Sequence, residues 1–172
     1  MSGPGFTVRP AGVADLGAVV DLVVEVAGEG RWIGTEQVDR AQRHDHLRAA
    51  LADPLRGVFV AVAGATVIGQ IGMTLQPYGV ADMGMLVEAS WRGRGVGSAL
   101  LGAGIDWARG AGAHKVALQV WPHNESAMAL YRKFGFVDEG RLRRHYKRRN
   151  GDLWDAVPMG LILADEQPAT DG

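Results

Sequence analysis

The segment that most constrains the fold is a glycine-rich run in the middle of the chain, Arg92-Gly93-Arg94-Gly95-Val96-Gly97. An apolar stretch, Met83–Val87, precedes it, and a run with helical character follows from Ser98. A strand that turns through glycines into a helix brings free backbone N–H groups and the positive end of the helix dipole to one point. Glycine also lets that backbone approach an anion closely. The segment therefore predicts a phosphate site, and a tight turn that binds nothing is the competing interpretation.

Three kinds of phosphate-binding loop compete for this segment. A Walker A loop requires Gly-Lys followed by Ser or Thr, and Val96-Gly97-Ser98 lacks the lysine. The dinucleotide fingerprint G-x-G-x-x-G requires its third glycine one residue later than Gly97, and it normally follows the first strand of a domain. The third kind has the form Gln/Arg-x-x-Gly-x-Gly/Ala and holds a pyrophosphate, and residues 92–97 match it.

The composition is that of one domain of ordinary size. The chain has 172 residues, of which 47% are hydrophobic, and a net charge of −1 that disfavours a nucleic-acid partner. Because there is no cysteine, disulfides and thiolate metal sites are excluded, and the five histidines lack metal-ligand spacing, so we expect no metal. The chain shows neither a signal-peptide pattern nor an apolar run of about 18 residues, so we expect a cytoplasmic protein with no membrane contact.

Hydrophobic periodicity divides the chain into seven strands and four helices. The strands are expected at about 6–9, 58–62, 67–73, 80–87, 116–121, 141–149 and 153–163, and the helices at about 15–26, 35–52, 98–109 and 124–133. Thr35 and Asn124 are candidate N-caps, and Asn150-Gly151 favours a type I′ hairpin between the last two strands. With no repeat and no linker, we expect one mixed α/β (α+β) domain over 1–172, with its core at about 6–163 and a flexible tail at 164–172.

A second motif lies downstream of the glycine turn and has the form Asn-x-x-Ala-x-x-x-Tyr-x-x-x-Gly-Phe, from Asn124 to Phe136. Together with residues 92–97 it resembles the core motifs of the GNAT superfamily of acyl-CoA-dependent N-acetyltransferases. The pattern from Phe136 to Met159 resembles the branch that includes amino-acid and phosphinothricin-type acetyltransferases. The resemblance implies a GNAT-like fold, in which about four helices flank a mostly antiparallel sheet of about seven strands that splays apart between strands four and five.

The resemblance also implies a site for acetyl-CoA. The pyrophosphate would meet the backbone of the glycine turn, and the pantetheine arm would run along the fourth strand, where a bulge helps to open the gap. The N–H of Val87 would point at the thioester oxygen as an oxyanion-hole donor. Asn124 would contact the pantetheine arm, cap its helix, or do both. The implied donor-binding residues are Met85, Leu86, Val87, Arg92, Gly93, Arg94, Gly95, Val96, Gly97, Ser98, Asn124 and Tyr131.

Tyr131 is implied as the catalytic group that donates to the departing thiolate, and a plain core position is the alternative interpretation. Because the ordinary pKa is about 10 for tyrosine and about 8.5 for a thiol, full proton transfer is uphill by roughly 2 kcal/mol, so a hydrogen bond costs less. Some relatives, such as the ribosomal-protein alanine acetyltransferases, carry a glutamate where this chain has Gln119, which accepts no proton at neutral pH. Glu88, Asp82, His123 or a chain of waters remain as alternative bases.

A site without an evident strong base suits an α-amine, whose pKa is about 7.7–8.0, better than a lysine side chain at about 10.4. We therefore expect a small amino acid or amino-acid-like acceptor. A protein N-terminus and a non-catalytic acyl-CoA-binding or sensor domain are the alternatives. Trp32, Gln119 and Glu88 are the candidate acceptor contacts.

The basic segment Arg141–Arg149 has two interpretations. It is either a surface that recognises a carboxylate or an acidic partner, or a solvated hairpin. Strand alternation would place Arg141, Arg143, His145, Lys147 and Arg149 on one face. The terminal hairpin and Trp154 are also candidate contacts of a homodimer.

Overall fold

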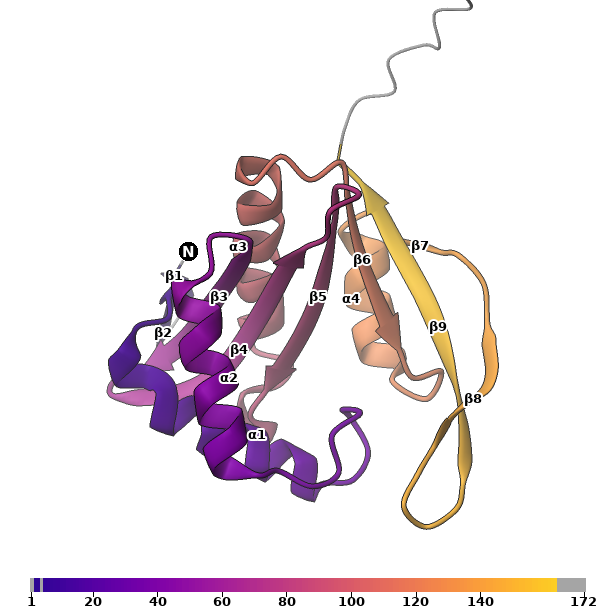
Figure 1. The fold of residues 1–172 in the computed structure, drawn as a ribbon, viewed down its shortest axis with the longest axis horizontal. Coiled ribbons are helices and arrows are strands. Elements are labelled where there is room, and N and C mark those ends of the chain that lie inside the picture. Colours follow the sequence, from indigo (N-terminus) through magenta and orange to yellow (C-terminus); the bar gives the residue numbers. More distant parts are fainter. Residues whose placement is uncertain (1, 4, 164–172) are drawn as a thin grey trace, which may run out of the picture.

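One mixed sheet forms the centre of the protein, as seen in a computed structural model that describes residues 2–3 and 5–163 (Figure 1). The strand order is β1-β2-β3-β4-β5-β6-β9-β7, and β8 pairs with β9 off this path. The strands are β1 Ser2–Gly3, β2 Phe6–Pro10, β3 Arg56–Ala63, β4 Thr66–Leu75, β5 Val80–Val87, β6 Lys115–Val120, β7 Val137–Asp138, β8 Leu142–Lys147 and β9 Leu153–Ile162. The seven longer strands are those expected from the sequence, and β1 and β7 add two residues each. The tail expected at 164–172 lies outside the described residues.

Helices cover both faces of the sheet (Figure 1). They are α1 Leu16–Gly28, α2 Arg40–Ala52, α3 Val96–Gly110 and α4 Glu125–Lys133, with short 3-10 turns at Val13–Asp15 (η1) and Ala89–Trp91 (η2). One core joins α1 and α2 to β3 and β4, with Val23 and Val60 at its centre. The other joins α3 and α4 to the opposite face, with Leu100 and Ile71 fully buried. This arrangement confirms the expected fold. Within the described residues, no helix is long and apolar enough to cross a membrane.

The strands β5 and β6 are parallel neighbours over only part of their length. They pair from Val80↔Lys115 to Asp82↔Ala117, and beyond that point β5 pairs with β4 while β6 continues along β9 to Val120↔Val157. This confirms the splayed sheet. The bulge expected in the fourth strand is wrong, because the described register between β4 and β5 runs without a shift from Leu75↔Ala81 to Gly69↔Val87. The gap opens because β6 follows β9 and turns away from a regular β5.

Two helix caps were predicted, and one of them is wrong. Asn124 caps α4 as expected, since its Oδ1 accepts from the Ala127 N–H at 3.3 Å. Helix α2 begins at Arg40 rather than near Thr35, and its cap is Asp39, whose Oδ1 accepts from Gln42 N–H at 3.0 Å. The sequence offered two residues of capping type in one polar segment, and helical periodicity does not choose between them.

The terminal hairpin is antiparallel as expected, but its turn is not type I′. The last paired residues are Lys147 and Leu153, which leaves a loop of residues 148–152. In this loop only Gly151 has a positive φ, at 92°, whereas a type I′ turn needs two such residues. The expected alternation of basic side chains also fails, because Arg144 takes φ 50° and the register shifts between Leu142 and Tyr146.

Two helical glycines should respond to substitution in opposite directions. An ideal Cβ on Gly104 of α3 would lie 2.8 Å from Ile71 Cδ1 and 3.0 Å from Met73 Sδ, whereas a Cβ on Gly17 of α1 meets nothing within 4 Å. We expect Gly104→Val to lower the free energy of unfolding by about 1–3 kcal/mol through overpacking. Gly17→Ala should raise it by about 0.5–1 kcal/mol. Urea denaturation measures both, and a Gly104→Val protein as stable as wild type would contradict the close packing of α3 on β4.

Candidate active site

The glycine turn between η2 and α3 leaves a row of backbone donors without partners. Gly93 and Gly95 take left-handed φ values of 73° and 84°, which glycine adopts without strain. The first hydrogen bond of α3 runs from the Ala99 N–H to the Gly95 carbonyl at 3.1 Å. Within the described chain, the N–H groups of residues 93–98 make no hydrogen bond. Free donors at a helix N-terminus are suited to bind an anionic group such as a pyrophosphate.

Arg92 holds this turn in place from within the protein. Its two terminal nitrogens donate to the Glu29 carboxylate at 2.8 and 2.6 Å, and its Nε donates to the Val87 carbonyl at 3.0 Å. The Trp32 indole N–H donates to the same carboxylate at 2.6 Å. The Arg92 guanidinium lowers the pKa of Glu29, and the Trp32 bond adds to this effect. Arg92 therefore ties the end of β5 to the end of α1, and its charge is already paired.

The backbone of Val87 faces the gap between β5 and β6. Glu88 N–H donates to the Ile68 carbonyl at 2.9 Å, and Val87 lies opposite Gly69 in the same ladder. Because hydrogen-bonded and non-hydrogen-bonded pairs alternate in antiparallel sheets, the N–H and C=O of Val87 point away from β4. The Arg92 bond occupies the carbonyl, and the splay leaves the N–H without a strand to pair with.

Tyr131 lies on α4 and is buried, with 7% of its surface exposed. Its ring packs 5.7 Å from that of Phe136. Burial raises the pKa of Tyr131 to about 12. A thiol has a pKa of about 8.5, so complete proton transfer from this phenol would be uphill by roughly 5 kcal/mol. This cost exceeds the one expected for a solvent-exposed tyrosine, because burial penalises the phenolate. The phenol is therefore a hydrogen-bond donor that stays protonated.

Two cavities meet beside Tyr131. The loop cavity, of about 390 Å³, is lined by the glycine turn and the start of α4. The sheet cavity, of about 480 Å³, lies between α2, the middle of β4 and β5, and β6. Both are lined by Trp32, Ile33, Met85, Leu86, Asn124 and Tyr131.

Most of the predicted donor-site residues line the loop cavity: Met85, Leu86, Val87, Arg92, Gly93, Gly95, Gly97, Ser98, Asn124 and Tyr131. Two do not. The Val96 side chain is in the core at 1% exposure, and the Arg94 guanidinium lies 5.3 Å from the Trp91 ring centroid. For Val96 only the backbone remains available to an anion.

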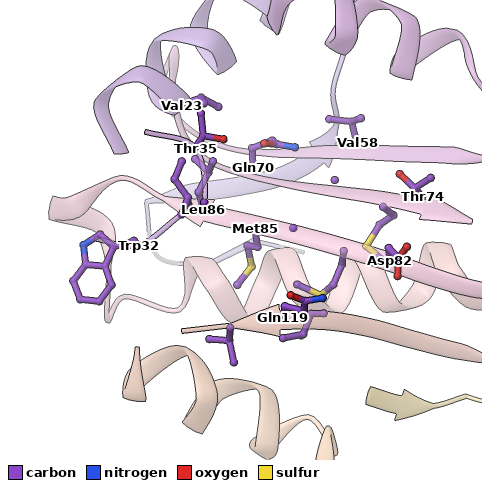
Figure 2. A pocket seen from close by; sticks show the side chains of 18 of the residues that line it. Val23, Trp32, Thr35, Val58, Gln70, Thr74, Asp82, Met85, Leu86 and Gln119 are labelled. Atoms are coloured by element: carbon purple, nitrogen blue, oxygen red, sulfur yellow. The ribbon is translucent and has the colours of Figure 1, made fainter. Parts of the chain in front are cut away.

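Polar side chains line the sheet cavity on both sides of the gap, among apolar ones (Figure 2). Gln119 of β6 lines it, and its Oε1 accepts from the Tyr146 hydroxyl at 2.6 Å. Figure 2 shows Gln70 and Leu86 on one side of the sheet and Met85 on the other. Tyr146, Gln70 and Arg43 also line the cavity, and sequence reasoning missed all three. No local motif marks them, since they come from β8, β4 and α2.

The alternative bases lie in different places. Glu88 lines neither cavity and caps η2, accepting from the Ser90 N–H at 3.0 Å and its hydroxyl at 2.5 Å. These bonds lower the pKa of Glu88. His123 also lines neither cavity, and its Nε2 lies 2.9 Å from the Arg31 carbonyl oxygen. Asp82 does line the sheet cavity and accepts from Gln76 Nε2 at 2.7 Å. Among the described residues, no three His, Asp or Glu side chains are grouped to hold a metal ion.

Comparison with known proteins identifies the class of protein to which this fold and this pair of cavities belong. Residues 22–136 match the acetyltransferase (GNAT) family. The chain belongs to the GNAT acetyltransferase family and is an N-acetyltransferase.

The names of two relatives indicate different acceptors. The chain is 34% identical to the L-amino acid N-acetyltransferase AaaT of Escherichia coli, over 69% of this chain and 76% of that protein. It is 33% identical to the N-alpha-acetyltransferase RimI of Mycobacterium tuberculosis, over 60% of this chain and 66% of that protein.

Solved structures show the same fold. The ribosomal-protein-alanine N-acetyltransferase of Brucella melitensis matches with a TM-score of 0.84 at 27% identity, covering 91% of this chain and 99% of that chain. The yncA protein of Salmonella typhimurium, solved with its cofactor acetyl-CoA, matches with a TM-score of 0.85 at 23% identity. The match covers 98% of this chain and 99% of that chain.

We predict a measurable energetic coupling between Glu29 and Arg92. A double-mutant cycle with Glu29→Gln and Arg92→Gln should give about 0.5–1 kcal/mol at pH 7, since both side chains are about one-third exposed. The pKa of Glu29 is lowered, so the coupling is fully present above its ordinary value of 4.5 and is lost as the pH falls through the lowered pKa. Chemical denaturation at several pH values measures it. Glu25→Gln, one turn earlier on α1, replaces Glu29→Gln in the control cycle. Absence of coupling between Glu29 and Arg92 at pH 7 would contradict the ion pair.

Proposed function

We propose that the protein transfers the acetyl group of acetyl-CoA directly to the primary amine of a small amino acid or amino-acid-like molecule. The observation that carries the proposal is the junction at Tyr131, where a cavity beside a turn with free N–H groups meets a second cavity of mixed polar and apolar lining. The names of the amino-acid acetyltransferase AaaT and of the methionine sulfoximine acetyltransferase of Pseudomonas aeruginosa, 28% identical over 144 residues, favour this acceptor class.

The residues of the loop cavity fit acetyl-CoA. The six free N–H groups of residues 93–98 suit a pyrophosphate, and the dipole of α3 adds positive potential at the same point. The backbone N–H and C=O groups of Met85 and Val87 face the splay, because these residues alternate with those that hydrogen-bond to β4. These groups can hydrogen-bond the amides of a pantetheine arm that runs along β5.

Acetyl-CoA supplies an acetyl thioester, and the chain supplies hydrogen bonds at both ends of its reacting bond. The Val87 N–H donates to the carbonyl oxygen, where negative charge grows as the amine nitrogen bonds to the carbonyl carbon. The carbon–sulfur bond breaks and its electron pair stays on sulfur, and the Tyr131 hydroxyl donates to that sulfur. The proton lost by the amine passes to water, because Gln119 is not basic.

Asp82 is poorly placed to act as a direct base. It precedes Val87 by five residues on β5, which corresponds to about 16 Å along a strand. An amine that arrives neutral or loses its proton to solvent needs neither Asp82 nor Gln119 as a base, and this favours acceptors with a low amine pKa.

Acetylation of a protein N-terminus is the second candidate function, favoured by the relationship to RimI. Both candidates use an α-amine and the same donor site. A thiol-release screen with acetyl-CoA against free amino acids, short peptides, polyamines and aminoglycosides separates them. Turnover of free amino acids supports the first candidate, turnover of peptides alone supports the second, and no turnover of any amine would contradict both.

The homodimer expected from the sequence stays a prediction.

We expect Tyr131→Phe to lower kcat at least tenfold while the Kd for acetyl-CoA stays within about twofold. The substitution removes one hydroxyl and keeps the ring packed against Phe136. Because the pKa of Tyr131 is about 12, its proton stays in place across the working range, so kcat/KM of the wild type should rise with pH through the amine pKa and show no fall below about pH 11. Steady-state kinetics and calorimetry measure these quantities, and unchanged turnover in Tyr131→Phe would rule out the donor role.

Gly95→Asp should abolish binding of acetyl-CoA. Gly95 has a φ of 84°, and its open surroundings would place the new carboxylate on the cavity side of the turn, where it repels a pyrophosphate. Gly112→Asp, just after the other end of α3, is the matched control, because Gly112 is equally open and has a similar φ of 80°. Titration calorimetry with acetyl-CoA decides the outcome, and retained affinity in Gly95→Asp would place the pyrophosphate elsewhere.

A further inference from the structure

Two polar side chains line the sheet cavity without a partner in the protein. Gln70 on β4 is 5% exposed, and its amide makes no hydrogen bond to the described residues. Arg43 on α2 has a buried Nε with no partner, and it pairs with no carboxylate in the described part of the chain. Buried polar groups in folded proteins are nearly always hydrogen-bonded, and the Arg43 Nε is an exception within the described residues. These two groups therefore point to a ligand.

The floor beneath them has no side chains. Gly72 and Gly84 are opposite each other on β4 and β5, on the same face as Gln70. An ideal Cβ on Gly72 would lie 3.2 Å from Gln70 Nε2, so the amide extends over this glycine. A Cβ on Gly84 would meet nothing within 4 Å. The paired glycines leave room for a small molecule that lies flat on the sheet below α2.

The charges around the floor favour an anion. The groups facing the cavity are the guanidiniums of Arg43 and Arg56, the imidazole of His46 and one carboxylate, Asp82, which already accepts from Gln76. Neither arginine forms an ion pair within the described residues. Burial lowers the pKa of Arg43, and the nearby charge of Arg56 lowers it further. An anion bound between them would relieve this repulsion.

Gln70 lines the same cavity as Leu86 and Tyr131. It pairs with Leu86, the residue before Val87, and adjacent strands lie about 4.8 Å apart. Figure 2 shows Gln70 and Leu86 together on the face that opens to the sheet cavity. In an α-amino acid the amine and the carboxylate share one carbon. An amine held beside Val87 and Tyr131 would therefore direct its carboxylate into the cavity that Gln70 and Arg43 line.

We infer that Arg43 and Gln70 bind the α-carboxylate of the acceptor, so that the substrate class is free amino acids rather than peptides. The inference rests on the proposed function. A guanidinium and an amide N–H both donate to carboxylate oxygens, and charge assistance strengthens the first of these bonds. A peptide N-terminus carries a neutral amide at the same position. It would leave the Arg43 charge unpaired, and its second residue would need space beneath α2.

The test compares free amino acids with their carboxamides. L-Methionine, L-leucine and L-phenylalanine are assayed against L-methioninamide, L-leucinamide and L-phenylalaninamide, and kcat/KM is expressed as the ratio of acid to amide. Differences in amine pKa cancel when this ratio is compared between variants. We expect Arg43→Gln to lower the ratio at least tenfold, with amide rates nearly unchanged, and Arg43→Lys to restore part of it. Arg48→Gln, an exposed arginine on α2 that lines neither cavity, should leave the ratio unchanged.

A binding measurement keeps the inference separate from turnover. With coenzyme A present, calorimetry should show that wild type binds N-acetyl-L-methionine at least tenfold more tightly than N-acetyl-L-methioninamide, and that Arg43→Gln loses this preference. Equal affinities in wild type, or an acid-to-amide ratio unchanged in Arg43→Gln, would overturn the inference while acetylation persists. Absence of acetylation for every amine would instead overturn the proposed function, and the calorimetry would still report on the anion site.

Discussion

The incomplete pairing of β5 with β6 is the constraint on which the rest of the site depends. Three residues of each strand form the parallel ladder, and it ends at Asp82 and Ala117. Past that point the outward backbone groups of β5 have no strand partner, and unpaired backbone groups are tolerated only where water or a ligand reaches them. A closed sheet would satisfy these groups and remove the junction of the two cavities. The fold therefore leaves part of its own hydrogen bonding open, and this creates the place for a second molecule.

The elements around the gap are held by interactions outside the sheet ladder. Arg92 connects the carbonyl of Val87 to Glu29 at the end of α1, so the open end of β5, the glycine turn and the segment carrying Trp32 form one cluster. On the other side, the buried Arg148 lies 4.3 Å from the Trp154 ring centroid and donates to the Gly34 carbonyl at 3.2 Å. The basic hairpin thus contributes one arginine to the interior, which neither interpretation of its sequence anticipated. Arg148 thereby connects the hairpin, on the β6 side of the gap, to the segment that follows α1 on the other side.

Local chemistry explains which features were predictable from the sequence. The glycine turn, the Asn124 cap and the position of Tyr131 each depend on a few consecutive residues, and the structure places them as expected. The floor of the sheet cavity depends on register. Gly72 and Gly84 have no marked local pattern, and they become a floor only because β4 and β5 align them. In the sequence, Arg43 is indistinguishable from other polar residues of the helix. Its partial burial follows from how α2 crosses the sheet. Hydrophobic periodicity predicts each element separately, but it does not predict the register of two strands or the position of a helix on the sheet.

Neither Tyr131 nor Gln119, which both line the sheet cavity, can act as the base in this reaction. Tyr131 keeps its proton because burial penalises its anion, and Gln119 is occupied by the Tyr146 hydroxyl, so neither removes a proton from the amine. On the proposed function, the two guanidiniums that face the sheet cavity disfavour an ammonium nearby and lower the pKa of the bound amine. The α-carboxylate of an amino acid offsets this repulsion enough for the molecule to bind. The same positive charge would then select a carboxylate and favour the neutral amine, which is the form that reacts.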